Sequence, residues 1–214
     1  MIKISNLTVI IDNQTIFNNL DLMVNINKIV ALSGSSGCGK STLLKTVIGR
    51  HIPAEGGIII NNMKLSLFNI DKIRKLTFYL PQDIRAFDDE TVEQFLEYPF
   101  SLTVNKNLEF SKQTALDYCD ELLLKPEIMT RQISTLSGGE RKRVGLMRGL
   151  LLKKSVFLLD EPTSGVDREA SDKIVNILRS LKDTTTLIIT HDKNLIASVD
   201  YHVDFVSLHR RINN

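Results

Sequence analysis

The sequence is poor in the features that mark several special classes of protein. It has no tryptophan and only two cysteines, Cys38 and Cys119, which lie far apart. Two distant cysteines offer neither a disulfide framework nor a metal cluster, and this usage fits a reducing cytosol. Basic and acidic residues nearly balance, 27 against 25, so the chain presents no broad field for nucleic acid or anionic lipid.

Long hydrophobic runs are also missing. The longest apolar run, residues 56–60, is far shorter than the roughly 20 residues that span a bilayer. The N-terminus, MIKISNLTVI, alternates like a strand and lacks the regions of a signal peptide. We therefore expect no membrane segment and no leader. A hydrophobic content of 43% over 214 residues is enough to bury a full core in one domain.

Three short apolar runs predict buried parallel strands. The first, residues 29–32, leads into a glycine loop that is followed by a helical pattern over residues 40–50. The other two, residues 156–162 and 185–192, are apolar and end in polar residues. Between them, residues 167–182 place their apolar side chains on one helical face. This alternation predicts a wound α/β core.

The remaining segments have other patterns. Residues 1–28 and 57–80 alternate in short β-like pieces with asparagine-containing turns, which predicts an antiparallel sheet beside the core. Residues 88–135 have helical patches broken by prolines. Together with the helix that follows them, they predict an inserted helical subdomain over about 88–153. Residues 1–214 are then one domain, an α/β core with an antiparallel β subdomain and this helical insertion.

The stretch GSSGCGKST (Gly34–Thr42) has the phosphate-loop spacing G-x-x-x-x-G-K-[ST]. Its glycines allow backbone N–H groups to turn toward phosphate oxygens, and the following helix points its positive end at the same anion. Lys40 is expected at the β and γ phosphates of a nucleotide, and Ser41 at Mg²⁺. The alternative, an ordinary glycine-rich turn, is disfavoured by the flanking strand and helix. The predicted nucleotide-binding residues here are Gly34, Ser35, Gly37, Cys38, Gly39, Lys40, Ser41 and Thr42.

The run VFLLDEP supplies acidic residues after a buried strand. A carboxylate at this place can reach Mg²⁺ through water, and a second one beside it can orient an attacking water. We therefore assign Asp160 to the metal and Glu161 to the role of general base. Alone, the pattern could equally be a strand that enters a solvated turn. Its position after the phosphate loop favours the metal site.

The pentapeptide LSGGE (Leu136–Glu140) precedes a second helical pattern. Ser137, Gly138 and Gly139 offer bare amides and a hydroxyl at a helix N-terminus, an arrangement that can hold an anion. A serine-rich turn is the plain alternative. Two such helix starts could face one phosphate if a second copy of the chain contributes its own.

These motifs, in this order, resemble the nucleotide-binding domain of the ATP-binding cassette (ABC) family over nearly the whole chain. The resemblance implies an α/β P-loop NTPase fold with an ABC-type core, an antiparallel β subdomain and an inserted helical subdomain. Between the phosphate loop and LSGGE lies a Q-loop glutamine, Gln82, in YLPQD. After the acidic pair come a D-loop, SGVD (Ser164–Asp167), and a histidine, His191, in ITHD. The D-loop has Gly165-Val166 where Ala-Leu is commoner, a departure that we expect to be tolerated.

The resemblance implies ATP and Mg²⁺ as ligands and a head-to-tail pair of chains. Ser137, Gly138 and Gly139 of one chain would close on the γ-phosphate that Lys40 of the other chain holds. Asp167 would cross the interface and organise the partner's site.

The resemblance also assigns catalytic groups. Gln82 would contact Mg²⁺ and the lytic water, so Ser41, Gln82 and Asp160 form the metal set. His191 would hold the γ-phosphate beside the base Glu161. Because both residues are present, nothing indicates a degenerate cassette that cannot hydrolyse ATP.

Two further features have competing interpretations. Family members place an aromatic residue against adenine, but the corresponding position here is Ile11, and Phe17, or a ring from another segment, could swing over to replace the missing ring. Cys38 could be a reactive thiol or a small filler.

The leading hypothesis is a separate ATPase subunit that dimerises on ATP and drives a transmembrane permease. Such a subunit would be cytoplasmic, peripheral on the membrane and without nucleic-acid partners. A non-transport ABC ATPase and a purely regulatory cassette are the alternatives. The family receives a helix of its membrane partner after the Q-loop, where four rings form either an exposed docking cluster or ordinary packing. These rings are Phe87, Phe95, Tyr98 and Phe100.

Overall fold

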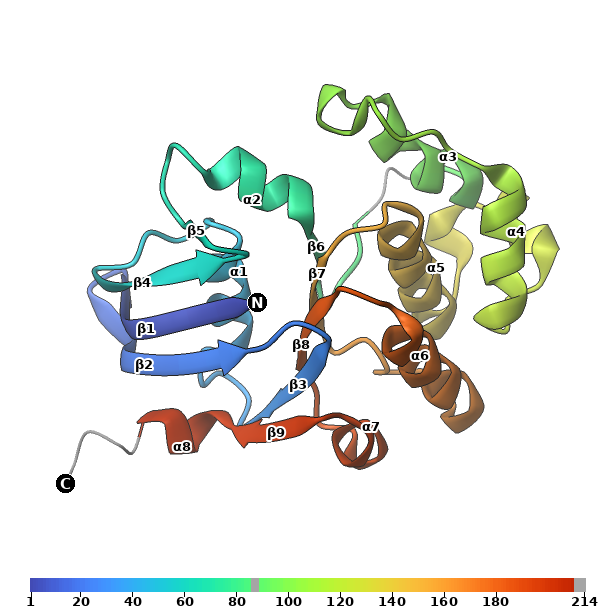
Figure 1. Ribbon diagram of the computed structural model, residues 1–214. Coiled ribbons are helices and arrows are strands. Elements are labelled where there is room, and N and C mark those ends of the chain that lie inside the picture. Colours follow the sequence, from blue (N-terminus) through green and yellow to red (C-terminus); the bar gives the residue numbers. More distant parts are fainter. Residues whose placement is uncertain (86–88, 210–214) are drawn as a thin grey trace.

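The computed structural model describes residues 1–85 and 89–209, which form two sheets surrounded by helices (Figure 1). The predicted α/β architecture, with an antiparallel sheet beside a parallel one, is confirmed. Within these described residues, no helix has both the length and the apolar character that crossing a membrane requires.

A five-stranded parallel sheet lies at the centre. All residues of two of its strands are buried, as expected when both faces of a parallel sheet are covered. The three predicted core strands are all present in it. Its strands, in spatial order, are β6 (Thr77–Leu80), β7 (Val156–Asp160), β8 (Thr185–Ile189), β3 (Lys28–Ser33) and β9 (Tyr201–Asp204).

The antiparallel sheet has tight asparagine turns where the sequence predicts them. Asp12 and Asn13 have φ values of 49° and 61°, and Asn61 and Asn62 have 45° and 65°. Two positive φ values match the twist of a two-residue hairpin, which asparagine and aspartate tolerate. The strands, in spatial order, are β2 (Gln14–Val24), β1 (Ile2–Ile11), β4 (Glu55–Ile60) and β5 (Met63–Lys64).

The predicted extent of this sheet, up to residue 80, is wrong at its end. Residues Ile70–Leu76 form helix α2, and the strand after it, β6, pairs in parallel with β7. The reason is that the run TFYL is continuous rather than alternating, and it pairs in register with Val156–Leu159 as an edge strand of the parallel sheet. Such a run suits a sheet that is buried on both faces.

Helical segments occupy the chain between β6 and β7, within the span predicted as a helical subdomain (Figure 1). The boundaries of that subdomain stay a prediction, since its last helix packs directly on the parallel sheet. The segments are α3 (Val92–Glu97), η1 (Tyr98–Ser101), η2 (Thr103–Asn105), α4 (Lys112–Glu121), η3 (Pro126–Thr130), η4 (Ile133–Thr135) and α5 (Gly138–Leu151). The other helices are α1 (Lys40–Val47), α6 (Arg168–Ser180), α7 (Lys193–Ser198) and α8 (Phe205–His209).

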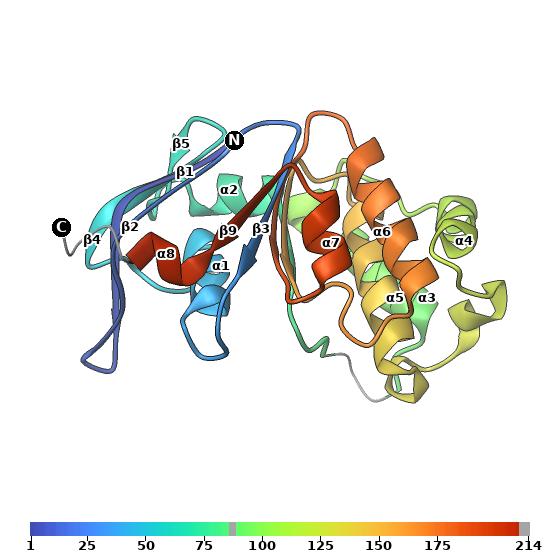
Figure 2. The same ribbon diagram turned by 90° about the horizontal axis from the view of Figure 1, so that it is seen from below.

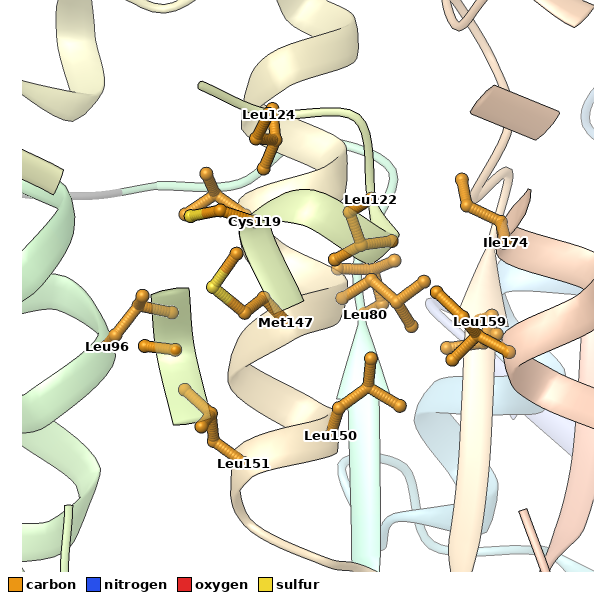
Figure 3. Packing of buried hydrophobic residues seen from close by; sticks show 14 of the residues in the cluster. Leu80, Leu96, Cys119, Leu122, Leu124, Met147, Leu150, Leu151, Leu159 and Ile174 are labelled. Carbon is orange, nitrogen blue, oxygen red and sulfur yellow. The ribbon is translucent and has the colours of Figure 1, made fainter. Parts of the chain in front are cut away.

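The parallel sheet separates two hydrophobic cores. On one face, α5 and α6 cover it, and Met147 and Leu150 of α5 lie against Leu80 and Leu159 (Figures 2 and 3). On the other face, α1 and the antiparallel sheet pack against the alternate strand residues, such as Leu158. With both faces covered, the open edge at the carboxyl ends of β3, β7 and β8 is left for a site.

Candidate active site at the strand ends

The phosphate loop connects β3 to α1. Gly39 caps the helix with φ 102°, and a Cβ added there would lie 2.8 Å from Cγ2 of Ile16. Gly37 has φ 80° and open space around it. The loop therefore needs glycine at Gly39 for conformation and packing, and at Gly37 for conformation, while its backbone stays accessible to a ligand.

Lys40 is 7% exposed and holds this loop in shape. Its Nζ donates to the carbonyl oxygens of Gly34 at 2.7 Å and Ser35 at 2.8 Å, and lies 3.7 Å from Sγ of Cys38. The eight predicted residues from Gly34 to Thr42 thus form one continuous loop and first helical turn. A helix start with inward amides and an ammonium group fits a polyphosphate.

Asp160 ends β7 with 3% of its surface exposed, and its carboxyl is hydrogen-bonded to Ser41. Burial raises the pKa of this carboxyl, whereas Ser41 and the ammonium groups of Lys142, Lys45 and Lys40 oppose the rise. Hydroxyl and carboxylate oxygens are the donors that Mg²⁺ prefers. The chemistry of this pair therefore fits the predicted metal, and a cation would compensate the buried charge.

A cavity of about 640 Å³ opens beside this pair. Ser41, Gln82 and Asp160 all line it, so the structure brings the three predicted metal residues to one space. Gln82 is exposed in the loop after β6. The rest of the lining is Lys45, Arg50, Tyr79, Pro81, Asp83 and Arg85.

Glu161 and His191 meet at the neighbouring ends of β7 and β8. Nε2 of His191 lies 3.6 Å from Oε1 of Glu161, and the histidine ring is half exposed. Glu161 has φ 53°, an uncommon value for a residue with a side chain. Burial raises the pKa of its carboxyl, whereas His191 lowers it. A desolvated carboxylate on a strained backbone, at the open edge of a sheet, is typical of functional sites.

The turn Ser137–Gly139 lies at the start of α5, apart from the phosphate loop. Ser137 accepts from the N–H of Glu140 at 3.2 Å, while Glu140 accepts from the N–H of Ser137 at 2.8 Å. This capping box orders the turn. Ser137 and Gly138 are exposed, and a Cβ added to Gly138 would meet no atom within 4 Å. In the described chain, no hydrogen bond joins this turn to the phosphate loop.

The D-loop packs against that turn. A Cβ added to Gly139 would lie 2.6 Å from the carbonyl oxygen of Gly165, so the two backbones are in direct contact. Asp167 caps α6 by accepting from the N–H of Ala170 at 2.9 Å, and its side chain is 69% exposed. The D-loop motif did not predict that Asp167 also caps α6.

Two contacts within the site involve residues that the motifs did not mark. Lys142 of α5 donates from Nζ to the carbonyl oxygen of Glu161 at 2.6 Å. Asp192 accepts from the hydroxyls of Thr163 at 3.1 Å and Ser171 at 3.2 Å, which ties the histidine loop to α6. Both contacts join segments far apart in the chain, so no local pattern could predict them.

The position expected to face the base is Ile11, a half-buried residue opposite Gln14 in the β1–β2 hairpin. Phe17 is 2% exposed and packs edge-on against Phe205 at 6.2 Å. In this conformation the ring of Phe17 is therefore held in the core, and its replacement of the missing aromatic ring stays a prediction.

The expected cluster of exposed rings is wrong in part. Phe95 is 3% exposed because α3 turns it inward, where the guanidinium of Arg148 lies 4.2 Å from its centroid. Phe100 packs against Phe110 at 5.6 Å, and Tyr98 is 51% exposed. Phe87 lies outside the described residues.

Comparison with known proteins agrees with this geometry. Among solved structures, the dimeric structure of a bacterial ABC transporter cassette has a TM-score of 0.83 and 25% identity, with 95% of this chain and 94% of that chain covered. A dimeric cassette bound to ADP and phosphate, at 24% identity, has a TM-score of 0.84 and covers 95% and 94%. The fold and the site together define an ATP-binding cassette.

The sequence model of the family described as ABC transporter matches residues 17–164, so the chain belongs to that family. The ABC transporter G family member 4 of Arabidopsis thaliana is 37% identical over 174 residues, 81% of this chain and only 30% of that protein. The probable iron export ATP-binding protein FetA of Escherichia coli (strain K12) is 29% identical over 203 residues, 94% of this chain and 88% of that protein.

Proposed function

We propose that this chain hydrolyses ATP as the nucleotide-binding subunit of a transporter. The observation that supports this best is the convergence at one sheet edge of the Lys40 loop, the Ser41–Asp160 pair and the Glu161–His191 pair. ATP, with Mg²⁺, would supply the phosphoanhydride bond that is broken. Steady-state ATPase assays of the purified chain with and without Mg²⁺ test the proposal, and absence of Mg²⁺-dependent turnover would contradict it.

The residues divide the work by their chemistry. Lys40 and the loop amides bind phosphate oxygens, while Ser41, Gln82 and Asp160 hold Mg²⁺. Glu161 orients a water and accepts its proton, because its carboxylate is desolvated yet reachable from the open edge. His191 holds the terminal phosphate from the adjacent strand end.

A second copy of the chain completes each site in this proposal. Ser137 and Gly138 of this turn are exposed, and the turn makes no hydrogen bond to its own phosphate loop within the described residues. A helix N-terminus of this kind attracts anions. In a head-to-tail pair it would face the phosphate held by Lys40 of the other copy, with Asp167 at the interface. Sizing chromatography with ATP and Mg²⁺ tests this pairing.

A groove of about 680 Å³ is the proposed seat of a permease helix. It runs between α2 and β6 on one side and residues 98–105 on the other. Leu102 and Val104 are among its exposed apolar residues, and Arg74, Lys75, Arg148 and Lys154 line it with one acidic residue, Asp71. The excess of positive charge in the groove favours an acidic amphipathic helix. Bound there, the chain would be peripheral on the cytoplasmic face of the membrane.

We expect Lys75→Glu with Lys154→Gln to weaken binding of an acidic helical peptide about tenfold, since it removes two positive charges from the groove. Glutamine can still donate to Oδ1 of Asn105, as Lys154 does at 2.9 Å. Fluorescence anisotropy with two labelled peptides, identical except for Glu or Lys on the polar face, measures the effect.

Lys3→Glu with Lys173→Gln, at exposed sites outside the groove lining, makes the same change in charge and is the matched control. Equal affinity of the wild-type chain for the two peptides would contradict the acidic occupant.

Nucleotide selectivity is expected to be weak because Ile11, rather than an aromatic residue, stands at the position expected to face the base. Stacking on a base contributes about 1–3 kcal/mol, of which isoleucine supplies only part. Ile11→Tyr should therefore tighten ATP binding about tenfold, whereas the wild type binds ATP and GTP with similar affinity. Titration calorimetry with both nucleotides measures this.

Ile10→Tyr is the control, since adjacent strand residues point to opposite faces. Strong ATP preference in the wild type, unchanged by Ile11→Tyr, would show that another group reads the base.

A further inference from the structure

Lys142 is a buried ammonium that no motif explains. It lies in the second turn of α5 with 8% of its surface exposed. Burial lowers its pKa, whereas the carboxylates of Glu161, Asp160 and Asp83 raise it. A lysine is rarely buried unless it is paired, because desolvating its charge is costly. Its position therefore requires a compensating contact.

That contact is the backbone of the proposed base. Nζ of Lys142 donates to the carbonyl oxygen of Glu161 at 2.6 Å. On the other side, the N–H of Glu161 donates to the carbonyl oxygen of Ile189 at 2.9 Å. Glu161 is thus held from α5 and from β8 while it adopts its positive φ of 53°. This conformation is unfavourable for a residue with a side chain, so it depends on such supports.

The same helix begins at the turn Ser137–Gly139, whose first two residues are exposed, one helical turn before Lys142. One rigid element therefore connects the turn offered to the second copy with the backbone of Glu161 in its own site. The charged groups that face this contact are Asp160 and Glu161 at the end of β7, Asp83 after β6, and His191 after β8.

We propose that Lys142 is a positioning residue, which ties the carbonyl of Glu161 to α5 so that the Ser137–Gly139 turn and the base move as one. This inference rests on the proposed ATPase function. It assigns Lys142 no contact with the nucleotide. Loss of its ammonium should release Glu161 from its conformation and slow hydrolysis, while the phosphate loop continues to bind nucleotide.

The test compares Lys142→Met, Lys142→Gln and Lys142→Arg in ATPase turnover and in the dissociation constant for a fluorescent ATP analogue. Lys142→Met should lower kcat at least tenfold and change the dissociation constant less than twofold. Lys142→Arg and Lys142→Gln keep a hydrogen-bond donor and should recover part of the rate. If Lys142 only filled space, side chains of such different shapes would not both restore turnover. Lys173→Met, an exposed lysine on α6, is the matched control.

A double variant tests the connection along α5. If Ser137 and Lys142 act through one path, Ser137→Ala with Lys142→Met should turn over no more slowly than the slower single variant. Losses that multiply would overturn the connection, and wild-type kcat in Lys142→Met would overturn the positioning role. Wild-type kcat in Lys142→Met would leave the proposed function intact, provided that Glu161→Gln still abolishes turnover.

Discussion

Glu161→Gln is expected to lower ATP turnover about a hundredfold to ten-thousandfold, the range for loss of a general base. Glutamine has nearly the same shape but cannot accept a proton. The backbone contacts of residue 161, with Ile189 and with Lys142, do not involve the carboxylate and should persist. Nucleotide binding should therefore be retained, and a closed dimer should accumulate with ATP.

Two measurements check this outcome together. Phosphate release gives the rate, and sizing chromatography with ATP and Mg²⁺ gives the dimer fraction. Glu169→Gln, an exposed glutamate in the first turn of α6, is the matched control. Normal turnover in Glu161→Gln would remove Glu161 from the role of base.

Lys40→Ala is expected to weaken ATP binding about a hundredfold, which corresponds to about 2.7 kcal/mol. The substitution removes the cation that is proposed to face the phosphates. It also removes the two hydrogen bonds that hold the carbonyl groups of Gly34 and Ser35. The loop should then lose part of its shape as well as its charge.

Equilibrium binding of a fluorescent ATP analogue measures the loss, and thermal unfolding monitored by circular dichroism shows whether the domain stays folded. Lys3→Ala, an exposed lysine on β1, is the control. Wild-type affinity in a folded Lys40→Ala chain would contradict the assignment of this loop.

The sequence predicts the parts of the site that depend on local pattern. Carboxyl ends of parallel strands meet at one edge, so the apolar runs before Asp160 and His191 are enough to bring these residues together. The phosphate loop is predicted for the same reason, since its spacing encodes its own backbone shape.

The sequence does not predict what depends on long-range packing. The TFYL run looks like an antiparallel continuation until its register with β7 is known. Phe95 is hidden by the turn of α3, and Lys142 acquires its partner only when α5 folds onto β7. These outcomes depend on neighbours that no short window of residues contains.

Because the parallel sheet separates two cores, it also determines how the destabilising effects of several substitutions combine. Met147 packs in the cluster on one face of the sheet, and Leu44 packs in the cluster on the other face. Alternate residues of the same strands belong to the two clusters. Substitutions that shorten side chains at distant sites with no shared partners have additive effects on the free energy of unfolding. A lineage can therefore repack the helical side without a matching change beneath the phosphate loop. The two halves of the cassette are free to diverge at different rates.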